Sequence, residues 1–334
     1  TVMATAKHYL GEGSTDYGQE GGTTTLSVKE IHERLLPPYK EAVKAGVGAV
    51  MVAFNSIYGQ NMHAHKELIT DTLKNGMNFD GIVVTDWQGF SRFGKNDIIN
   101  AGVDMVMSVD GNLDSFQSEL KKGVENDSVP IARIDDAVRR ILRQKYRLGL
   151  FDNPYPDSSL ISLIGCQEHR DKARQAVRQS LVLLKNKDNI LPINKNIGKI
   201  VVVGEHADNS GFQSGGWTVN WQGTNTNYKG STTILQGINK IALGEVIYDT
   251  NAELRLSDAD IAIIIVGETP YVEWFGDIGD GTGEYKLTLS EKHENYINTY
   301  VNMGVKTVAI LVSGRPLVIT EQLNQVDAFI AAWL

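Results

Sequence analysis

Cysteine is nearly absent from this sequence, and other features that would point to particular protein classes are missing too. The single cysteine, Cys166, cannot form a disulfide within the chain, so the fold neither requires nor excludes an oxidising compartment. No run of apolar residues approaches the roughly 20 that a membrane-spanning helix needs. Neither observation identifies the compartment.

An excess of positive charge is also lacking. The 32 lysines and arginines stand against 40 aspartates and glutamates, which gives a formal net charge of −8. The basic residues are scattered among the acids and form no stripe that could follow a phosphate backbone. This distribution argues against nucleic acids and anionic membrane surfaces as partners.

Motifs that bind phosphate, dinucleotides or metals are missing as well. The sequence contains no P-loop, no dinucleotide fingerprint and no Gly-x-Ser-x-Gly turn. The seven histidines show no metal-ligand spacing, because His63 and His65 have no cysteine or acidic third partner beside them. A glycine-rich run at 279–283 follows no strand and is interpreted as a loop. The sequence therefore predicts no cofactor and no metal site.

Apolar residues are abundant, in a chain that is too long for one ordinary core. The 334 residues are 42% hydrophobic, which predicts two domains. The sequence opens at Thr1 without a charged-then-apolar leader, and it stops within the apolar run 328–334. We therefore expect it to be a segment of a longer protein.

Residues 1–152 alternate short apolar stretches with amphipathic ones, which is typical of parallel βα units. Strands are predicted at 2–9, 49–55, 81–86 and 104–108. Helices are predicted at 28–45, 66–75, 113–125 and 131–146. Four successive parallel strands with polar residues at their carboxyl ends predict the C-terminal half of a (β/α)8 TIM-type barrel.

A second alternating series follows a predicted linker at 153–167, which contains two prolines and several other turn-forming residues. The second domain, 168–334, begins with a helix predicted at 168–184. Its strands are predicted at 199–204, 245–248, 261–266, 307–312 and 328–333, and further helices at 234–242 and 291–303. Because the strands are nearly continuous valine and isoleucine, we expect a doubly wound α/β sandwich covered on both faces.

Asp86 is the first candidate for chemistry, because it ends the apolar strand 81–86. Functional groups of barrel enzymes gather at the carboxyl ends of the strands. A carboxylate at this position could equally cap the next helix. The adjacent Trp87 favours a pocket, because an indole suits the apolar face of a sugar ring.

Lys7 and His8 end the first predicted strand and precede the turn Gly11-Glu12-Gly13, which allows the backbone to pass close to a ligand. The pair offers hydrogen-bond donors for sugar hydroxyls, although such pairs also occur on plain surfaces. Glu20 lies in the loop beyond. On local grounds it is equally well explained as a solvated loop acid.

The segment 266–277 combines acids with aromatic residues at the end of an apolar strand, where open α/β sheets bind ligands. Retaining glycoside hydrolysis needs an ionised nucleophile and a second, protonated carboxyl group about 5–5.5 Å away. Glu273 stands beside Trp274 and Phe275, apolar neighbours that would favour a protonated carboxyl. Its competitors are Glu268 and Asp277, and the sequence does not separate the three.

Two tryptophans, Trp217 and Trp221, lie in a loop at 215–223 that begins and ends with glycine. Indoles in loops are unfavourable in water unless they cover something. They could fill an interface between the two domains, or they could form the aromatic wall of a sugar subsite.

Taken together, these segments resemble the family 3 glycoside hydrolases, specifically the two-domain exo-β-glucanase and β-glucosidase branch. The likeness covers nearly the whole chain in the family's order. Its motifs are Lys7-His8, Thr85-Asp86-Trp87, Gly-Leu-Phe-Asp-Asn-Pro at 149–154, Val-Leu-Leu-Lys-Asn at 182–186, Leu-Pro-Ile at 191–193, the tryptophan loop, Gly-Glu-Thr-Pro-Tyr-Val-Glu at 267–273 and Ser-Gly-Arg-Pro at 313–316.

The resemblance implies a role for each matching residue. Asp86 would be the nucleophile and Glu273 the general acid/base, delivered by different domains. The residues implied to bind the terminal sugar are Lys7, His8, Glu20 and Arg92, with Trp87 and Trp221 as the aromatic clamp around the next one. Trp217 is a candidate through its place in the tryptophan loop. The chain departs from the plant-type enzymes at Phe54, where they carry a tyrosine.

The implied function is the release of β-D-glucose from the non-reducing ends of β-glucosides or β-glucans by double displacement, without cofactor or metal. The alternatives are a family member with another sugar, such as a β-xylosidase, and a carbohydrate-binding protein without catalysis. The branch that releases N-acetylglucosamine is disfavoured, because its Asp-x-His loop motif is replaced here by Asp16-Tyr17-Gly18. The resemblance favours a secreted or periplasmic protein whose partner is an oligosaccharide or glucoside substrate.

Overall fold

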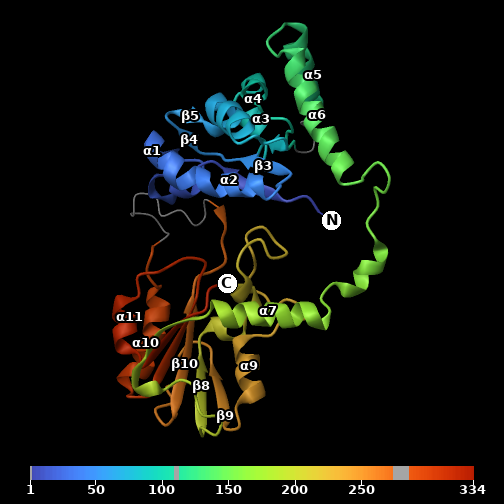
Figure 1. Ribbon diagram of the computed structural model, residues 1–334. Coiled ribbons are helices and arrows are strands. Elements are labelled where there is room, and N and C mark those ends of the chain that lie inside the picture. The colour runs from blue at the N-terminus through green and yellow to red at the C-terminus, as the bar shows by residue number, and fades with distance from the viewer. Residues whose placement is uncertain (1, 109–112, 274–285) are drawn as a thin grey trace. The chain divides into compact units, whose positions relative to one another are not determined.

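The computed structural model describes residues 2–108, 113–273 and 286–334, and it divides into two units, Thr1–Asp157 and Ser158–Leu334 (Figure 1). Each unit has its own sheet and its own apolar core. Among the described residues, no helix combines the length and the apolar character needed to cross a membrane.

The first unit is built on a parallel sheet in the order β1-β3-β6, formed by Thr5–Tyr9, Ala49–Val52 and Ile82–Val84. The fourth predicted strand, 104–108, contributes one parallel bridge between Val84 and Met105. The predicted succession of parallel βα units is therefore confirmed. A small sheet that the sequence did not predict joins β2 (Thr23–Thr24), β4 (Ser56–Ile57) and β5 (Gln60–Asn61).

Helices follow the strands of this unit at the predicted places. The stretch predicted at 28–45 begins with a capping box between Ser27 and Glu30, and it includes one π-helical turn. The helical elements are η1 (Glu12–Ser14), η2 (Asp16–Gly18), α1 (Val28–Glu30), η3 (Ile31–Leu35), α2 (Leu36–Lys44), η4 (Met62–Ala64), η5 (Glu67–Gly76), α3 (Gly89–Arg92), α4 (Asn96–Ala101), α5 (Leu113–Glu125) and α6 (Ile131–Arg147). Leu36, Ile69 and Ile98 from these helices are fully buried in one cluster with the sheet residues Val50 and Val83.

The second unit is built on a six-stranded sheet in the order β7-β12-β11-β10-β8-β9. Its strands are β7 (Val182–Asn186), β8 (Lys199–Val203), β9 (Glu245–Asp249), β10 (Ile261–Gly267), β11 (Thr307–Val312) and β12 (Ala328–Ala331). All neighbours are parallel except β7, which pairs antiparallel with β12 at the edge. The central strand β10 is buried along its whole length, as its run of isoleucines predicts.

Helices cover both faces of this sheet, which confirms the doubly wound architecture. Leu235 and Ile238 of α9 (Ile234–Ile241) pack in the cluster on one face, whereas Ile297 and Tyr300 of α10 (Glu291–Asn302) pack in the cluster on the other. The remaining helical elements are η6 (Ser158–Leu163), α7 (Gln167–Ser180), η7 (Lys187–Asn189), η8 (Glu205–Asp208), α8 (Ser210–Ser214) and α11 (Thr320–Gln325).

One predicted element was wrong in part. The helix predicted at 168–184 ends at Ser180, because Leu181 leaves the helical backbone angles with a ψ of 133°. Residues 182–184 belong instead to β7, where Val182 and Leu183 pair with Ala331 and Ile330. Leucine is compatible with either structure. Pairing with β12, the last strand of the unit in sequence, therefore favours the strand here.

Candidate active site

Asp86 lies two residues beyond the end of β6 at Val84, and its carboxylate is held from two sides. The Trp87 backbone N–H donates to Oδ1 over 2.6 Å, and Nε2 of His8 lies 3.5 Å from Oδ2. The Asp86 side chain is 16% exposed, so it remains reachable from solvent. The carboxyl ends of parallel strands meet at one edge of a sheet, which explains how β1 and β6 bring His8 and Asp86 together.

A buried histidine that the sequence analysis did not assign to the site fixes the backbone of Asp86. The Asp86 N–H donates to Nε2 of His63 over 3.1 Å, so this nitrogen carries the lone pair and the ring proton lies on Nδ1. Burial lowers the pKa of His63 to about 4, with a further contribution from the Arg92 charge, and the backbone of Ala53 opposes the shift. His63 is therefore a neutral ring that accepts the backbone N–H of the residue carrying the carboxylate.

Arg92 is anchored by aromatic rings beside the same histidine. Its guanidinium carbon lies 4.9 Å from the ring centre of Phe54 and 5.7 Å from that of Phe93. Phe93 in turn stacks on His63 with ring centres 4.8 Å apart. Phe54 thus offers Arg92 a cation–π contact. Trp87 is 54% exposed, as a platform for a ligand would be.

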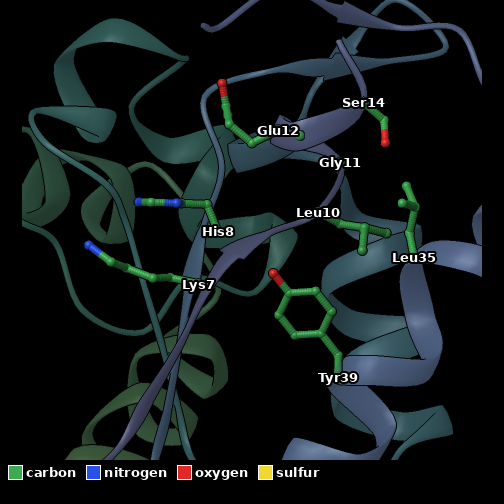
Figure 2. A pocket seen from close by; sticks show the side chains of 9 residues that line it. Lys7, His8, Leu10, Gly11, Glu12, Ser14, Leu35 and Tyr39 are labelled. Carbon is green, nitrogen blue, oxygen red and sulfur yellow. The ribbon is translucent and has the colours of Figure 1, made fainter. Parts of the chain in front are cut away.

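A cavity of about 420 Å³ adjoins the end of β1. Figure 2 shows the side chains of Lys7 and His8 pointing to the same side, away from Tyr39 and Leu35. Lys7 is exposed and His8 half-buried. The exposed ammonium of Lys7 can therefore reach a ligand at the carboxyl end of the strand, next to the His8 ring that contacts Asp86. The cavity is lined by Lys7, His8, Leu10, Gly11, Glu12, Gly13, Ser14, Leu35 and Tyr39.

Glu12, which the sequence analysis treated only as part of a turn, joins two loops of this region. Its Oε1 accepts from the N–H of Gly21 over 2.8 Å, and its Oε2 accepts from the N–H groups of Phe54 and Asn55 over 3.0 and 3.2 Å. The carboxylate thus ties the loop that carries half-buried Glu20 to the end of β3. The flanking glycines were the signal available in the sequence, and Gly11 adopts a left-handed φ of 95° before this turn.

In the second unit, the tryptophan loop packs against the segment that carries Glu273. The side chain of Gln222 accepts from the Val272 N–H over 3.0 Å. A Cβ on Gly216 would lie 2.1 Å from a methyl group of Val272, so only glycine permits this close approach. Glu273 itself is half-buried with φ of 56°.

The tryptophans of this loop expose much of their indole surface, 69% for Trp217 and 41% for Trp221. A backbone hydrogen bond of 2.9 Å from the Trp217 N–H to the Trp221 carbonyl holds the two ends of the loop tip together. The structure thus places the loop that carries Trp217 and Trp221 against Val272, the residue before Glu273.

Among the acids of this segment, the Glu268 carboxylate is already bound by other side chains. Arg315 binds its Oε1 through Nε and Nη2 over 3.0 and 2.9 Å, and the Tyr271 hydroxyl donates to Oε2 over 3.1 Å. Burial and the Glu268 charge raise the pKa of Tyr271 to about 12. Glu268 therefore braces the segment, which favours Glu273 over it as proton donor. Asp277, Trp274, Phe275 and the run 279–283 lie outside the described residues.

Comparisons with known proteins indicate the same family for both parts of the chain. Residues 1–144 match the glycosyl hydrolase family 3 N terminal domain, and residues 181–334 match the family's C-terminal domain. The lysosomal beta glucosidase of Dictyostelium discoideum is 32% identical over 360 residues, covering 97% of this chain and 43% of that protein.

Solved structures are similar over the same range. The exo-1,3/1,4-beta-glucanase ExoP from a Pseudoalteromonas species has a TM-score of 0.92 at 38% identity, covering 99% of this chain and 43% of that one. The beta-glucosidase from Listeria innocua in complex with glucose has a TM-score of 0.85 at 28% identity, covering 100% of this chain and 47% of that one. The chain thus spans about half the length of these relatives. With both of its domains matched, the chain belongs to glycosyl hydrolase family 3.

Proposed function

We propose that the protein containing this chain is a retaining β-glucosidase or exo-β-glucanase that releases β-D-glucose from non-reducing ends. The observation that carries the proposal is the Asp86 carboxylate, presented at the carboxyl end of β6 beside His8 and the exposed indole of Trp87. The named activities of the relatives, a β-glucosidase and an exo-1,3/1,4-β-glucanase, support the same reaction class.

In the proposed first step, a carboxylate oxygen of Asp86 attacks the anomeric carbon while Glu273 donates a proton to the departing glycosidic oxygen. The bond to the leaving group breaks, and a covalent glycosyl-enzyme forms. The Trp87 N–H and the neutral His63 ring hold the Asp86 carboxylate and backbone in one orientation, which reduces the cost of reaching the attacking geometry.

In the second step, Glu273 accepts a proton from water, which attacks the same carbon and restores Asp86. Lys7, His8, Glu20 and Arg92 are proposed to bind the hydroxyls of the terminal glucose, since three of them provide cationic or imidazole donors and one an acceptor. Trp87, Trp217 and Trp221 are proposed to contact the apolar faces of the sugar rings.

Kinetics of two variants in the full-length protein test these assignments. Asp86→Ala is expected to lower kcat by about 10⁴-fold or more on every substrate, because no nucleophile replaces it. Glu273→Ala is expected to lose about 10²–10⁴-fold on glucosides with poor leaving groups and far less on an activated aryl glucoside, which needs no proton. Glu268→Gln is the matched control, and its rate should not depend on the leaving group in this way.

Equal loss by Glu273→Ala on both substrate types would remove its assignment as acid. Hydrolysis of an aryl xyloside faster than the aryl glucoside would replace the glucosidase by a β-xylosidase. Binding of cello-oligosaccharide without any turnover would favour a carbohydrate-binding protein.

A further inference from the structure

A second group of polar side chains lies in the second unit, and the proposed hydrolysis does not use it. Glu205 and His206 follow the end of β8, and His293 lies in the first turn of α10. One side-chain oxygen or nitrogen atom of each of the three residues lies within 4.8 Å of the other two. His293 is distant in sequence from the adjacent Glu205 and His206, so no spacing motif indicates the group.

The two histidines carry nitrogen atoms that their surroundings leave without a hydrogen bond. His206 is 1% exposed and His293 5% exposed, yet Nδ1 of His206 and both ring nitrogens of His293 have no hydrogen-bond partner. Nearly all buried polar atoms in folded proteins are hydrogen-bonded, so three such atoms in one place require a physical reason.

The contacts around the rings indicate which atoms carry lone pairs. Nε2 of His206 lies 3.1 Å from the Glu268 carbonyl, which can only accept, so Nε2 bears the proton and Nδ1 the lone pair. A backbone carbonyl that holds the second ring nitrogen is the usual support of a metal-ligating histidine.

The spacing of the group also suits an ion. Oε1 of Glu205 lies 3.7 Å from Nε2 of His293, too far for a hydrogen bond. Two ligands of a tetrahedral ion with bonds of about 2.0–2.1 Å are separated by about 3.3 Å. A movement of a few tenths of an ångström by the half-exposed Glu205 would therefore bring this pair of atoms to the separation of two ligands.

We propose that Glu205, His206 and His293 form a binding site for a divalent cation of the zinc class. Two imidazoles and one carboxylate are a ligand set that zinc accepts, with a fourth position for water. Gly267 makes room for this arrangement, since a Cβ there would lie 3.0 Å from the His206 ring and 2.1 Å from the Val312 carbonyl.

The site is structural in character and independent of the proposed hydrolysis. Through the Glu268 carbonyl, His206 is joined to the residue whose side chain binds Arg315 and Tyr271. An ion on His206 would thus stiffen the beginning of the segment that runs on to Glu273, without touching substrate.

Lys292 is the neighbouring charge that opposes an ion. Its ammonium lies 2.8 Å from Oε2 of Glu205 and leaves Oε1 facing His293. Removing this cation should therefore strengthen metal binding. If Glu205 served only as a partner for Lys292, the same change would leave metal affinity unaltered.

The test uses the full-length protein, freed of metal with a chelator and titrated with zinc chloride by calorimetry. We expect one ion per chain with a Kd of about 1 μM or tighter, and visible absorption bands of a tetrahedral ion when cobalt(II) replaces zinc. Glu205→Gln should weaken binding by about 10-fold or more, and Lys292→Gln should tighten it.

His169→Gln, at an exposed position of α7 in the same unit, is the matched control and should bind as the unaltered protein does. Glu205 is 37% exposed, so its replacement is tolerated by the fold, and circular dichroism of the metal-free variants verifies this. Absence of binding at about 1 mM zinc would overturn the proposal. Equal affinity of Glu205→Gln and the unaltered protein would also overturn it, because the ion would then lie elsewhere.

Discussion

Single side chains near Asp86 act mainly by holding other groups in place. Glu12 binds three backbone N–H groups from two loops, and His63 accepts the backbone N–H of Asp86. Neither residue needs to touch a substrate to matter. His63 also makes this region sensitive to pH. It is fully buried, so a proton on its ring would place a positive charge away from water.

The pH dependence of stability should reveal His63. Its pKa is about 4 in the fold and about 6.5 in an unfolded chain, so between these values the unfolded state binds more protons. Stability from this residue is fully present above pH 6.5 and is lost as the pH falls towards 4. The difference between these two pKa values corresponds to about 3 kcal/mol of stability.

Urea unfolding of the unaltered protein and of His63→Gln at pH 7.5 and pH 4 measures this effect. The decrease in the free energy of unfolding from pH 7.5 to pH 4 should be about 3 kcal/mol smaller in the variant than in the unaltered protein. His32→Gln, an exposed histidine of the same unit, should keep the unaltered pH dependence. If His63→Gln also keeps it, the ring is not held neutral as described.

The candidate residues at strand ends could be predicted from sequence because a parallel sheet collects the ends of its strands at one edge. His8 and Asp86 meet for that reason. The supporting contacts of Glu12, His63 and Gln222 could not be predicted, because each depends on how loops from distant parts of the chain fold back. Loop conformations follow from many weak contacts and leave no periodic pattern.

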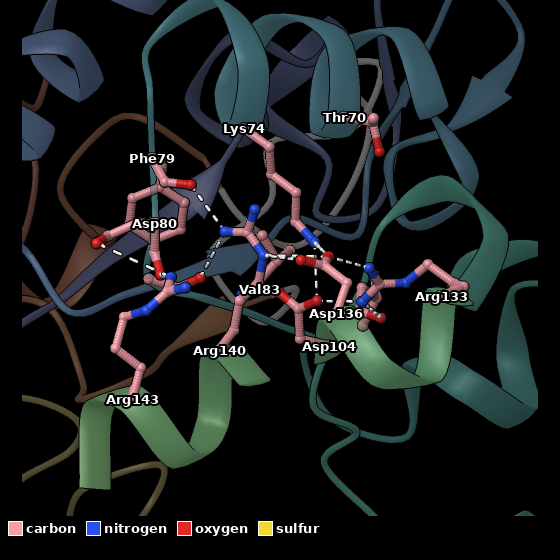
Figure 3. A network of polar contacts seen from close by, with 12 residues as sticks. Thr70, Lys74, Phe79, Asp80, Val83, Asp104, Arg133, Asp136, Arg140 and Arg143 are labelled. Atoms are coloured by element: carbon pink, nitrogen blue, oxygen red, sulfur yellow. Dashed lines mark hydrogen bonds and ion pairs between the residues drawn. The ribbon is translucent and has the colours of Figure 1, made fainter. Parts of the chain in front are cut away.

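At the scale of elements, a buried charge network joins β6, η5 and α6. Lys74 and Arg133 converge on Asp104, and Arg133 and Arg140 converge on Asp136 (Figure 3). Oδ2 of Asp104 accepts from the Val83 N–H over 2.9 Å, which anchors the strand itself. Although burial alone would raise it, the arginines and Lys74 lower the pKa of Asp136 to about 2.

Removing the central acid should destabilise the first unit strongly. The Asp104 carboxylate is fully buried and Lys74 is only 4% exposed, so Asp104→Ala would leave Lys74 and Arg133 with the partly exposed Asp136 as their shared anion. We expect a loss of about 3–5 kcal/mol in the free energy of unfolding, measured by chemical denaturation.

The matched control is Glu33→Ala, which removes the exposed pair between Lys29 and Glu33, 3.9 Å apart. It should change the free energy of unfolding by less than about 1 kcal/mol. An Asp104→Ala variant as stable as this control would mean that the network contributes nothing beyond surface charge.

Most elements were predictable because their periodicity is strong, as in β10 and α6, whereas the exceptions involve competition. Residues 182–184 fit a helix locally but join β7, since pairing with β12 satisfies their backbone. The two-residue strands β2, β4 and β5 are too short to leave any alternation in the sequence.

For the whole molecule, the two units divide between Asp157 and Ser158, within the predicted linker 153–167. The predicted domain limits of 1–152 and 168–334 stay predictions. Asp86 belongs to the first unit and Glu273 to the second, so the proposed reaction requires contributions from both. Tyr155 is 79% exposed, which indicates a connection with few contacts of its own.

Lengthening this connection should therefore slow the reaction without unfolding the protein. Insertion of Gly-Ser after Tyr155 in the full-length protein is expected to lower kcat by about 10-fold or more, because catalytic groups tolerate little misplacement. The same insertion after Asp127, in an exposed turn within the first unit, should leave kcat nearly unchanged. An unaltered kcat in the linker variant would argue against a shared reaction centre.

The antiparallel pairing of β7 with β12 also bears on how the second unit is made by the ribosome. The strand that begins the sheet emerges first, yet its neighbour is synthesised only after every other strand of the sheet. At about 5–20 residues per second, β7 waits roughly ten seconds with its backbone groups unpaired. During that interval the nascent chain is a substrate for chaperones, and a pause in translation before residue 328 would prolong its exposure to aggregation.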